Sequence, residues 1–209
     1  MRGNLEAQIA ALIPWWSTDF GEPEIAAVSA AIRDRNISQG KITRQFEERL
    51  AEVLGVPYVV CTTSGTTALT MALLACGIHK GVEIWLPDRT WIASAHAAMM
   101  AGLQVRLADV THGAPLLDPE GVNPNAIACM PVNLNGWLSN VEALSADWII
   151  EDSCQSFPAP PRGDIACYSL SVAKIISTGQ GGFCATRSNE AFDIADGTQQ
   201  RRARTNADL

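Results

Sequence analysis

The alternation of short apolar runs with helix-patterned segments over residues 58–152 is the feature that most limits how this chain can fold. The apolar runs have the length and composition of strands, whereas the segments between several of them have apolar residues at helical spacing. Because strands that alternate with helices form parallel sheets covered on both faces, the pattern predicts an α/β fold, a three-layer sandwich with a mainly parallel sheet. Strands are expected at 58–62, 82–87, 104–110, 126–132, 147–151 and 164–170, and helices at 66–77 and 90–102.

Two further helices are expected before this alternation begins. Residues 21–35 carry apolar side chains at helical spacing, with acidic residues at the start and basic residues at the end, as the helix dipole favours. Residues 43–55 repeat this pattern, with Thr43 as the expected N-cap and Gly55 as the residue that ends the helix.

Composition and charge exclude several classes of protein. With 209 residues, 47% apolar and 18% charged, one domain is expected over 1–209, with 1–20 as an N-terminal arm. The net charge of −7 argues against a nucleic-acid partner. No apolar run approaches the roughly 20 residues of a membrane span, and no basic stretch followed by an apolar one opens the chain, so a cytoplasmic protein without a membrane partner is expected. The six cysteines include no CxxC pair, so neither a structural zinc site nor a disulfide framework is expected. The three histidines have no evident partners, so they predict no metal site either.

Polar residues gather between Glu151 and Gly182. Asp152 directly follows the predicted strand 147–151, and open α/β sheets bind ligands at the carboxyl ends of their strands. Lys174, one of only three lysines, follows the next strand on a short loop, so its amine can reach the same crevice. Pyridoxal phosphate (PLP) chemistry requires a lysine that bonds to the carbonyl carbon of the cofactor. It also requires a carboxylate that pairs with the nitrogen of the cofactor ring. For each residue alone, a helix cap or an exposed surface side chain is the commoner alternative.

The loop after strand 58–62 offers a place for a phosphate. Backbone N–H groups of Gly65 and Thr66 are expected at the positive end of a helix, and Gly65 has no side chain to hinder an anion. Such loops are common, and their polar residues equally fit helix caps. Trp91 opens another predicted helix beside a strand end, where its indole face could stack on a pyridine ring; a tryptophan in the core or on the surface is the commoner case.

Taken in order, these motifs resemble the DegT/DnrJ/EryC1/StrS sugar aminotransferases, which are fold-type I PLP enzymes. Several ordered blocks at family-like spacing are more specific than any single motif. The resemblance implies the large domain of that fold, without the small C-terminal domain that closes over the substrate in the family. The similar blocks are IPWWSTDFGEPEI, SQGKITRQFEERLAEVLGVPYVV, TSGTTALTMALLACGI, LPDRTWIASAHAAMMAGLQVRLADV, EDSCQS and SLSVAKIISTGQGG.

The resemblance also implies a role for each candidate residue. Lys174 and Asp152 would be catalytic, Gln155 would bond the phenolic oxygen of PLP, and Ser169 would contact its phosphate. Alone, Gln155 would indicate nothing, and Ser169 would be an ordinary serine at a strand end. The implied cofactor-binding residues are Gly65, Thr66, Trp91, Asp152, Gln155, Ser169 and Lys174.

The function implied by the resemblance is transfer of an amino group from glutamate or glutamine to a nucleotide-linked keto-sugar, as in polysaccharide biosynthesis. Family active sites lie at a dimer interface, which implies a homodimer. Residues 38–45 match a family stretch near the substrate pocket, so part of the acceptor site is expected here. Three interpretations stay open: a compact aminotransferase, one half of a split enzyme whose small domain is a separate chain, and a non-catalytic interaction protein that kept the fold.

Overall fold

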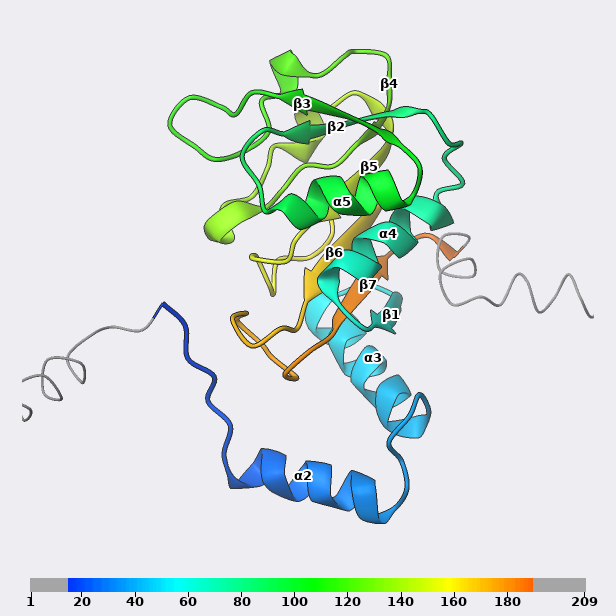
Figure 1. Ribbon diagram of the computed structural model, residues 1–209, viewed down its shortest axis with the longest axis vertical. Coiled ribbons are helices and arrows are strands. Elements are labelled where there is room, and N and C mark those ends of the chain that lie inside the picture. Colours follow the sequence, from blue (N-terminus) through cyan, green and yellow to red (C-terminus); the bar gives the residue numbers. More distant parts are fainter. Residues whose placement is uncertain (1–14, 190–209) are drawn as a thin grey trace, which may run out of the picture.

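The computed structural model describes residues 15–189, which form a seven-stranded sheet with helices on both faces (Figure 1). The strand order is β1-β7-β6-β5-β4-β2-β3, and every neighbouring pair is parallel except the two pairs made by β7. The predicted α/β fold with a mainly parallel sheet is therefore confirmed. The strands are β1 (Tyr58–Thr62), β2 (Glu83–Pro87), β3 (Gln104–Ala108), β4 (Ala126–Cys129), β5 (Ala146–Asp152), β6 (Ile165–Ser169) and β7 (Gly182–Thr186).

Two helical layers cover the sheet, and the alternation of side chains along each strand supplies both interfaces. On β6, Ile165 and Cys167 pack with α4 and α5, whereas Ala166 and Tyr168 pack with α3 on the opposite face. Tyr168 stacks on Phe183 of β7, with ring centroids 4.6 Å apart. Burial on both faces explains why a central strand such as β6 is a nearly continuous apolar run, whereas the edge strand β3 is largely exposed and contains polar residues. The helices are α2 (Glu22–Arg33), α3 (Lys41–Leu54), α4 (Gly65–Ala75) and α5 (Ile92–Met100), with short 3-10 turns at Pro119–Gly121, Leu134–Gly136 and Val141–Ala143.

The helices and strands predicted between residues 21 and 170 are all present, with shifted ends. Gly55 ends α3 in the left-handed conformation, at φ +62°, as predicted. The prediction of Thr43 as the N-cap of this helix is wrong, because the helix begins at Lys41 and Gly40 is its N-cap. Strand β7 was not predicted, since it follows a glycine cluster and pairs only with distant segments of the chain.

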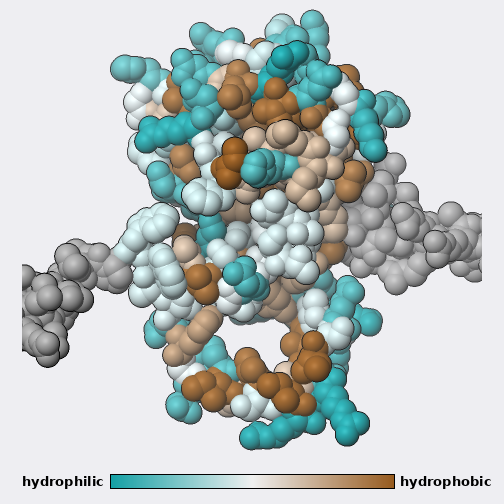
Figure 2. Space-filling view, viewed as in Figure 1, coloured by the Kyte–Doolittle hydropathy of each residue, from teal (hydrophilic) through white to brown (hydrophobic). Residues whose placement is uncertain are grey.

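The segment before α3 lies largely apart from the sheet (Figure 1). None of the residues of α2 is buried, and its apolar side chains Ile25, Val28 and Ile32 are 57%, 60% and 61% exposed. Figure 2 shows apolar surface on this helix beside an opening between it and the rest of the molecule. The preceding arm touches the body where the Thr18 hydroxyl donates to the Val172 carbonyl at 3.0 Å.

The predicted N-terminal arm is described only from residue 15 onward, and residues 188–209, whose sequence also predicts a helix, lie mostly outside the described residues. Within 15–189, no helix is both long and apolar enough to cross a membrane.

Candidate active site

The carboxyl ends of β1, β5 and β6 lie at the same edge of the sheet. Because β7 is antiparallel to both β1 and β6, its first residue, Gly182, pairs with Ser169 on one side and Thr62 on the other. Asp152 ends β5, which is parallel to β6 and adjacent to it. The topology therefore brings Asp152, Ser169 and the start of α4 to one edge, as the sequence predicts.

The backbone at the start of α4 packs very closely against the ends of the strands. A Cβ built on Gly65 would lie 2.9 Å from the Cβ of Ser169 and 2.9 Å from the Sγ of Cys154. A Cβ on Gly182 would lie 2.5 Å from the carbonyl carbon of Ser64. Both positions require glycine because any side chain would force the helix away from the sheet.

This close packing leaves a set of hydrogen-bond donors at the helix end. Gly65 and Thr66 are the first two residues of α4, so their N–H groups have no acceptor within the helix. Ser64 is the N-cap, and its hydroxyl oxygen accepts from the Thr67 N–H at 3.1 Å. The Ser169 hydroxyl oxygen accepts from the Ser171 N–H at 3.4 Å, which leaves its O–H free to donate. Two backbone donors and one hydroxyl at a positive helix end fit a phosphate group.

Asp152 is buried, with 5% of its surface exposed, and hydrogen bonds reach both of its carboxylate oxygens. The Cys154 N–H donates to Oδ1 at 3.1 Å, and the Ser94 hydroxyl donates to Oδ2 at 2.7 Å. Ser94 lies in the first turn of α5 and is fully buried. This contact was not predicted from the sequence, although Ser94 lies three residues after Trp91, in the same turn of the predicted helix.

Lys174 lies in the loop between β6 and β7, residues 170–181, which we call the lysine loop. Its backbone N–H donates to the Ser171 carbonyl at 3.0 Å, and its side chain is half-buried. Burial raises the pKa of the Cys154 thiol well above its ordinary value, the Asp152 carboxylate raises it further, and the positive charge of Lys174 lowers it. The charges of Asp152 and Lys174 thus act on the pKa of the same thiol in opposite directions.

Gln155 and Trp91 are the two remaining predicted site residues. The Gln155 Oε1 accepts from the Asn135 N–H at 3.1 Å, so its Nε2 is the end left to donate to a ligand. Trp91 is the N-cap of α5 and is 68% exposed. Its carbonyl oxygen accepts from the N–H of Ser94 at 3.1 Å, which ties the tryptophan backbone to the residue that contacts Asp152.

A buried polar network behind Asp152 holds the loop that follows β5. Glu151, 1% exposed, accepts at Oε1 from the N–H groups of Arg162, at 2.6 Å, and Gly163, at 2.8 Å. Its Oε2 accepts from the Nδ2 of Asn133 at 3.0 Å and lies 3.5 Å from the Arg162 guanidinium. The same Asn133 amide donates to the Ser153 hydroxyl at 2.9 Å. These contacts fix the strand end that carries Asp152, and the sequence analysis did not predict them.

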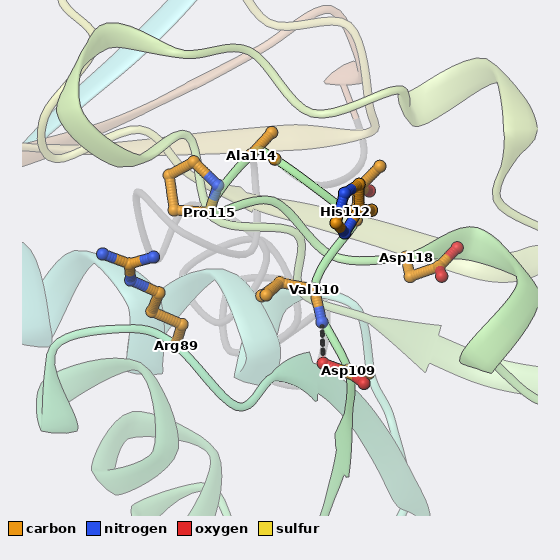
Figure 3. Close-up of a pocket in the computed structure, with 9 residues that line it drawn as sticks. Arg89, Asp109, Val110, His112, Ala114, Pro115 and Asp118 are labelled. Atoms are coloured by element: carbon orange, nitrogen blue, oxygen red, sulfur yellow. Dashed lines mark hydrogen bonds between the residues drawn. The ribbon is translucent and has the colours of Figure 1, made fainter.

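A separate hollow of about 620 Å³ lies at the far end of the same sheet edge (Figure 3). It is formed by Arg89, which follows β2, and by the turn after β3, from Asp109 to Asp118. Figure 3 shows Arg89 and Asp118 on opposite sides of Val110, whose N–H donates to the Asp109 carboxylate at 2.7 Å. Because β3 is three strands away from β5, this hollow is distinct from the Asp152 cluster, and none of the predicted site residues lines it. Within residues 15–189, no group of three His, Cys, Asp or Glu side chains could hold a metal ion.

Comparison with known proteins gives consistent matches. The chain is 30% identical over 205 residues to a putative L-glutamine:3-amino-2,3-dideoxy-scyllo-inosose aminotransferase of Micromonospora echinospora, covering 87% of this chain and 49% of that protein. It is 32% identical over 170 residues to the GDP-perosamine synthase of Caulobacter vibrioides, covering 73% and 46% of the two chains. The crystal structure of NtdA from Bacillus subtilis with bound cofactor PMP superposes with a TM-score of 0.77 at 25% identity, covering 88% of this chain and 47% of that one.

The chain thus spans about half the length of these relatives. Residues 18–201 match the family model described as the DegT/DnrJ/EryC1/StrS aminotransferase family. Since this match extends over most of the sequence, the chain belongs to the DegT/DnrJ/EryC1/StrS aminotransferase family.

Proposed function

We propose that this chain forms the cofactor-binding part of a PLP-dependent aminotransferase that transfers an amino group to a nucleotide-linked keto-sugar. One observation carries the proposal: a buried carboxylate, a helix end with free N–H donors and a half-buried lysine converge at the carboxyl edge of one sheet. Family membership supports this reaction class. The GDP-perosamine synthase among the relatives supports an acceptor linked to a nucleotide.

The described residues fit PLP by their chemistry. When bound, PLP acts as an electron sink for a substrate amine and carries the amino group between two half-reactions. In our proposal, Asp152 accepts the hydrogen bond of the protonated ring nitrogen. The N–H groups of Gly65 and Thr66 and the Ser169 hydroxyl donate to the phosphate, because each has an uncommitted donor at the same helix end. The close packing at Gly65 keeps this set of donors together.

Two further residues complete the proposed cofactor site. The Nε2 of Gln155 donates to the phenolic oxygen, since its Oε1 already accepts from Asn135. Trp91 covers one face of the ring, because it begins the turn whose Ser94 contacts Asp152.

Lys174 would hold the cofactor through its amine, and once a substrate amine had replaced it there, the freed Lys174 amine would move the proton at the substrate α-carbon. Its position supports this role, because the lysine loop follows β6 directly at the sheet edge where Asp152 lies. The other two lysines lie elsewhere: Lys41 begins α3, and Lys80 precedes β2 at the amino end of the parallel strands.

The proposed amino donor is glutamate or glutamine, and the proposed assembly is a homodimer. The relative named as an L-glutamine aminotransferase supports the choice of donor. A separate chain that supplies the rest of the substrate site is a second candidate, and one observation favours it: within residues 15–189, the apolar side chains Ile25, Val28 and Ile32 of α2 are more than half exposed. A non-catalytic interaction protein is the third interpretation. The cytoplasmic location expected from the sequence also remains a prediction.

The test uses the purified protein with added PLP. We expect a visible absorption band that borohydride abolishes, with reduction attaching the cofactor covalently to the peptide that contains Lys174. Lys174→Ala should lose the band and the covalent attachment. The matched control Lys80→Ala, which removes an exposed lysine at the opposite edge of the sheet, should keep both.

If Lys174→Ala retained the borohydride-sensitive band, the role of Lys174 would be wrong. Failure of the wild-type protein to bind PLP would contradict the proposed function. Aminotransfer by the purified chain alone would exclude the need for a separate chain.

A further inference from the structure

A pair of hydroxyl groups lies directly behind the carboxylate of Asp152. The Oγ of Ser94 is 2.7 Å from the Asp152 Oδ2 and 2.8 Å from the Oγ1 of Thr90. Ser94 is fully buried, and Asp152 is 5% exposed, so the carboxylate has few alternative partners in water. The Trp91 carbonyl lies 3.2 Å from the same Ser94 oxygen.

The number of protons in this cluster fixes the direction of its hydrogen bonds. A hydroxyl carries one proton, and a carboxylate only accepts, so the Ser94 proton is given to Asp152. A hydrogen bond to a charged acceptor is also stronger than one to the neutral Trp91 carbonyl. The Ser94 oxygen can therefore only accept from Thr90, and the bonds run in one direction, from Thr90 to Ser94 to Asp152.

This arrangement fixes the plane of the carboxylate from two separate elements. The terminal torsion of an aspartate is broad, so a carboxylate with a single partner can rotate. Here Oδ1 is held by the Cys154 N–H from the loop after β5, and Oδ2 is held by Ser94 from α5. Trp91 is the N-cap of the same helix, and its carbonyl accepts from the Ser94 N–H at 3.1 Å, so Ser94 connects the carboxylate to the proposed ring-stacking residue.

We propose that Ser94, supported by Thr90, is a positioning residue that orients the Asp152 carboxylate toward the protonated ring nitrogen of the bound cofactor. This inference rests on the proposed function. A helix-capping role does not explain Ser94, because the N-cap of α5 is Trp91 and the Ser94 hydroxyl points to another element. The Ser94 hydroxyl therefore orients Asp152 and does not cap the helix.

The test compares two ligands that differ at one atom. Pyridoxamine phosphate has the ring nitrogen, and its deaza analogue has a C–H group there and forms no bond with Asp152. Ser94→Ala should weaken binding of pyridoxamine phosphate about tenfold or more, the loss expected for a hydrogen bond to a charged group, and change binding of the analogue less than about twofold. A loss of general stability would weaken both ligands equally.

Variants at Thr90 provide a second, milder test. Thr90→Val keeps the shape of the side chain and removes the hydroxyl, so it should weaken pyridoxamine phosphate binding by a smaller factor, again without affecting the analogue. Thr90→Ser keeps the hydroxyl and should bind both ligands like the wild type. The control Thr186→Val removes a part-buried hydroxyl that donates to the Asp164 carbonyl at 2.7 Å, at the other end of β7, and should leave both affinities unchanged.

Calorimetric titration of each protein with both ligands gives the affinities, and thermal unfolding confirms that each variant is folded. Equal losses for the two ligands, or no loss in Ser94→Ala and Thr90→Val, would overturn the inference while leaving the proposed function intact. Absence of pyridoxamine phosphate binding by the wild type would overturn both. Equal wild-type affinity for the two ligands would overturn the role of Asp152 and the inference that depends on it.

Discussion

The first residue of α4, Gly65, packs so closely on Ser169 that a Cβ at position 65 would lie 2.9 Å from the Ser169 Cβ. Real side chains do not approach so closely, so Gly65→Ala should displace the start of α4 from the end of β6. We expect the free energy of unfolding to fall by about 1–3 kcal/mol, as in other overpacked interiors. Binding of PLP should weaken at least about tenfold, because the N–H donors at the helix end shift away from Ser169. Urea unfolding and PLP titration measure the two effects.

Gly121→Ala is the matched control, since a Cβ at this position would lie 3.4 Å from the Ala108 Cβ, an ordinary contact. Its effect on unfolding should stay within about 0.5 kcal/mol. If Gly65→Ala matched this control in both measurements, the start of α4 would be free to move, and the close packing would have no role in anion binding.

Asp152→Asn should separate cofactor binding from stability. The amide oxygen can still accept from the Cys154 N–H, and the amide nitrogen can donate to the Ser94 hydroxyl, so the internal hydrogen bonds are replaced. A neutral amide has no charge to stabilise a protonated pyridine nitrogen. We therefore expect a small change in the free energy of unfolding, under about 1.5 kcal/mol, and a loss of pyridoxamine phosphate affinity of about tenfold or more. Unchanged affinity in this variant would show that Asp152 does not contact the ring.

Much of the sheet could be predicted because most strands are recognisable from their own residues, without knowledge of which strands they pair with. Strands β1 to β6 lie in segments rich in apolar residues, and the positions of Asp152 and Ser169 at the ends of β5 and β6 place both residues at one edge. Strand β7 was missed because its place depends on long-range contacts: Gly182 must be glycine only because the backbone of Ser64 lies against it. The contact between Ser94 and Asp152 was missed for the same reason, since 58 residues separate the two partners.

The buried Glu151 offers a test of a feature that strand patterns do not reveal. Its two carboxylate oxygens accept from two backbone N–H groups and from the Asn133 amide. Glu151→Gln replaces one acceptor by a donor, so in either orientation an N–H group faces another donor. We expect the free energy of unfolding to fall by about 2–4 kcal/mol, since a buried polar network is left unsatisfied. Glu142→Gln, at an exposed position, is the control, and an equally small effect in both variants would show that the network relaxes without cost.

Stability at alkaline pH should depend on the buried thiol of Cys129. Burial raises the pKa of this thiol from its ordinary value near 9 to about 12. Between these values the unfolded chain loses the thiol proton and the folded protein keeps it, so the free energy of unfolding falls as pH rises from about 9 toward 12 and is unaffected below that range. One such group contributes about 1.4 kcal/mol per pH unit to the slope.

Cys129→Ala should therefore lose stability less steeply between about pH 9 and pH 11 than the wild type, by roughly 1 kcal/mol per pH unit. Urea unfolding with a reductant present measures the slope. Thr186→Val, which removes a group that does not titrate in this range, should keep the wild-type slope even if its stability is lower throughout. Cys76, whose pKa burial also raises to about 12, should behave like Cys129 when replaced by alanine. If the free energy of unfolding fell with pH equally steeply in the wild type and in Cys129→Ala, the folded protein would lose this proton as readily as the unfolded chain. Burial would then not raise the pKa of the thiol.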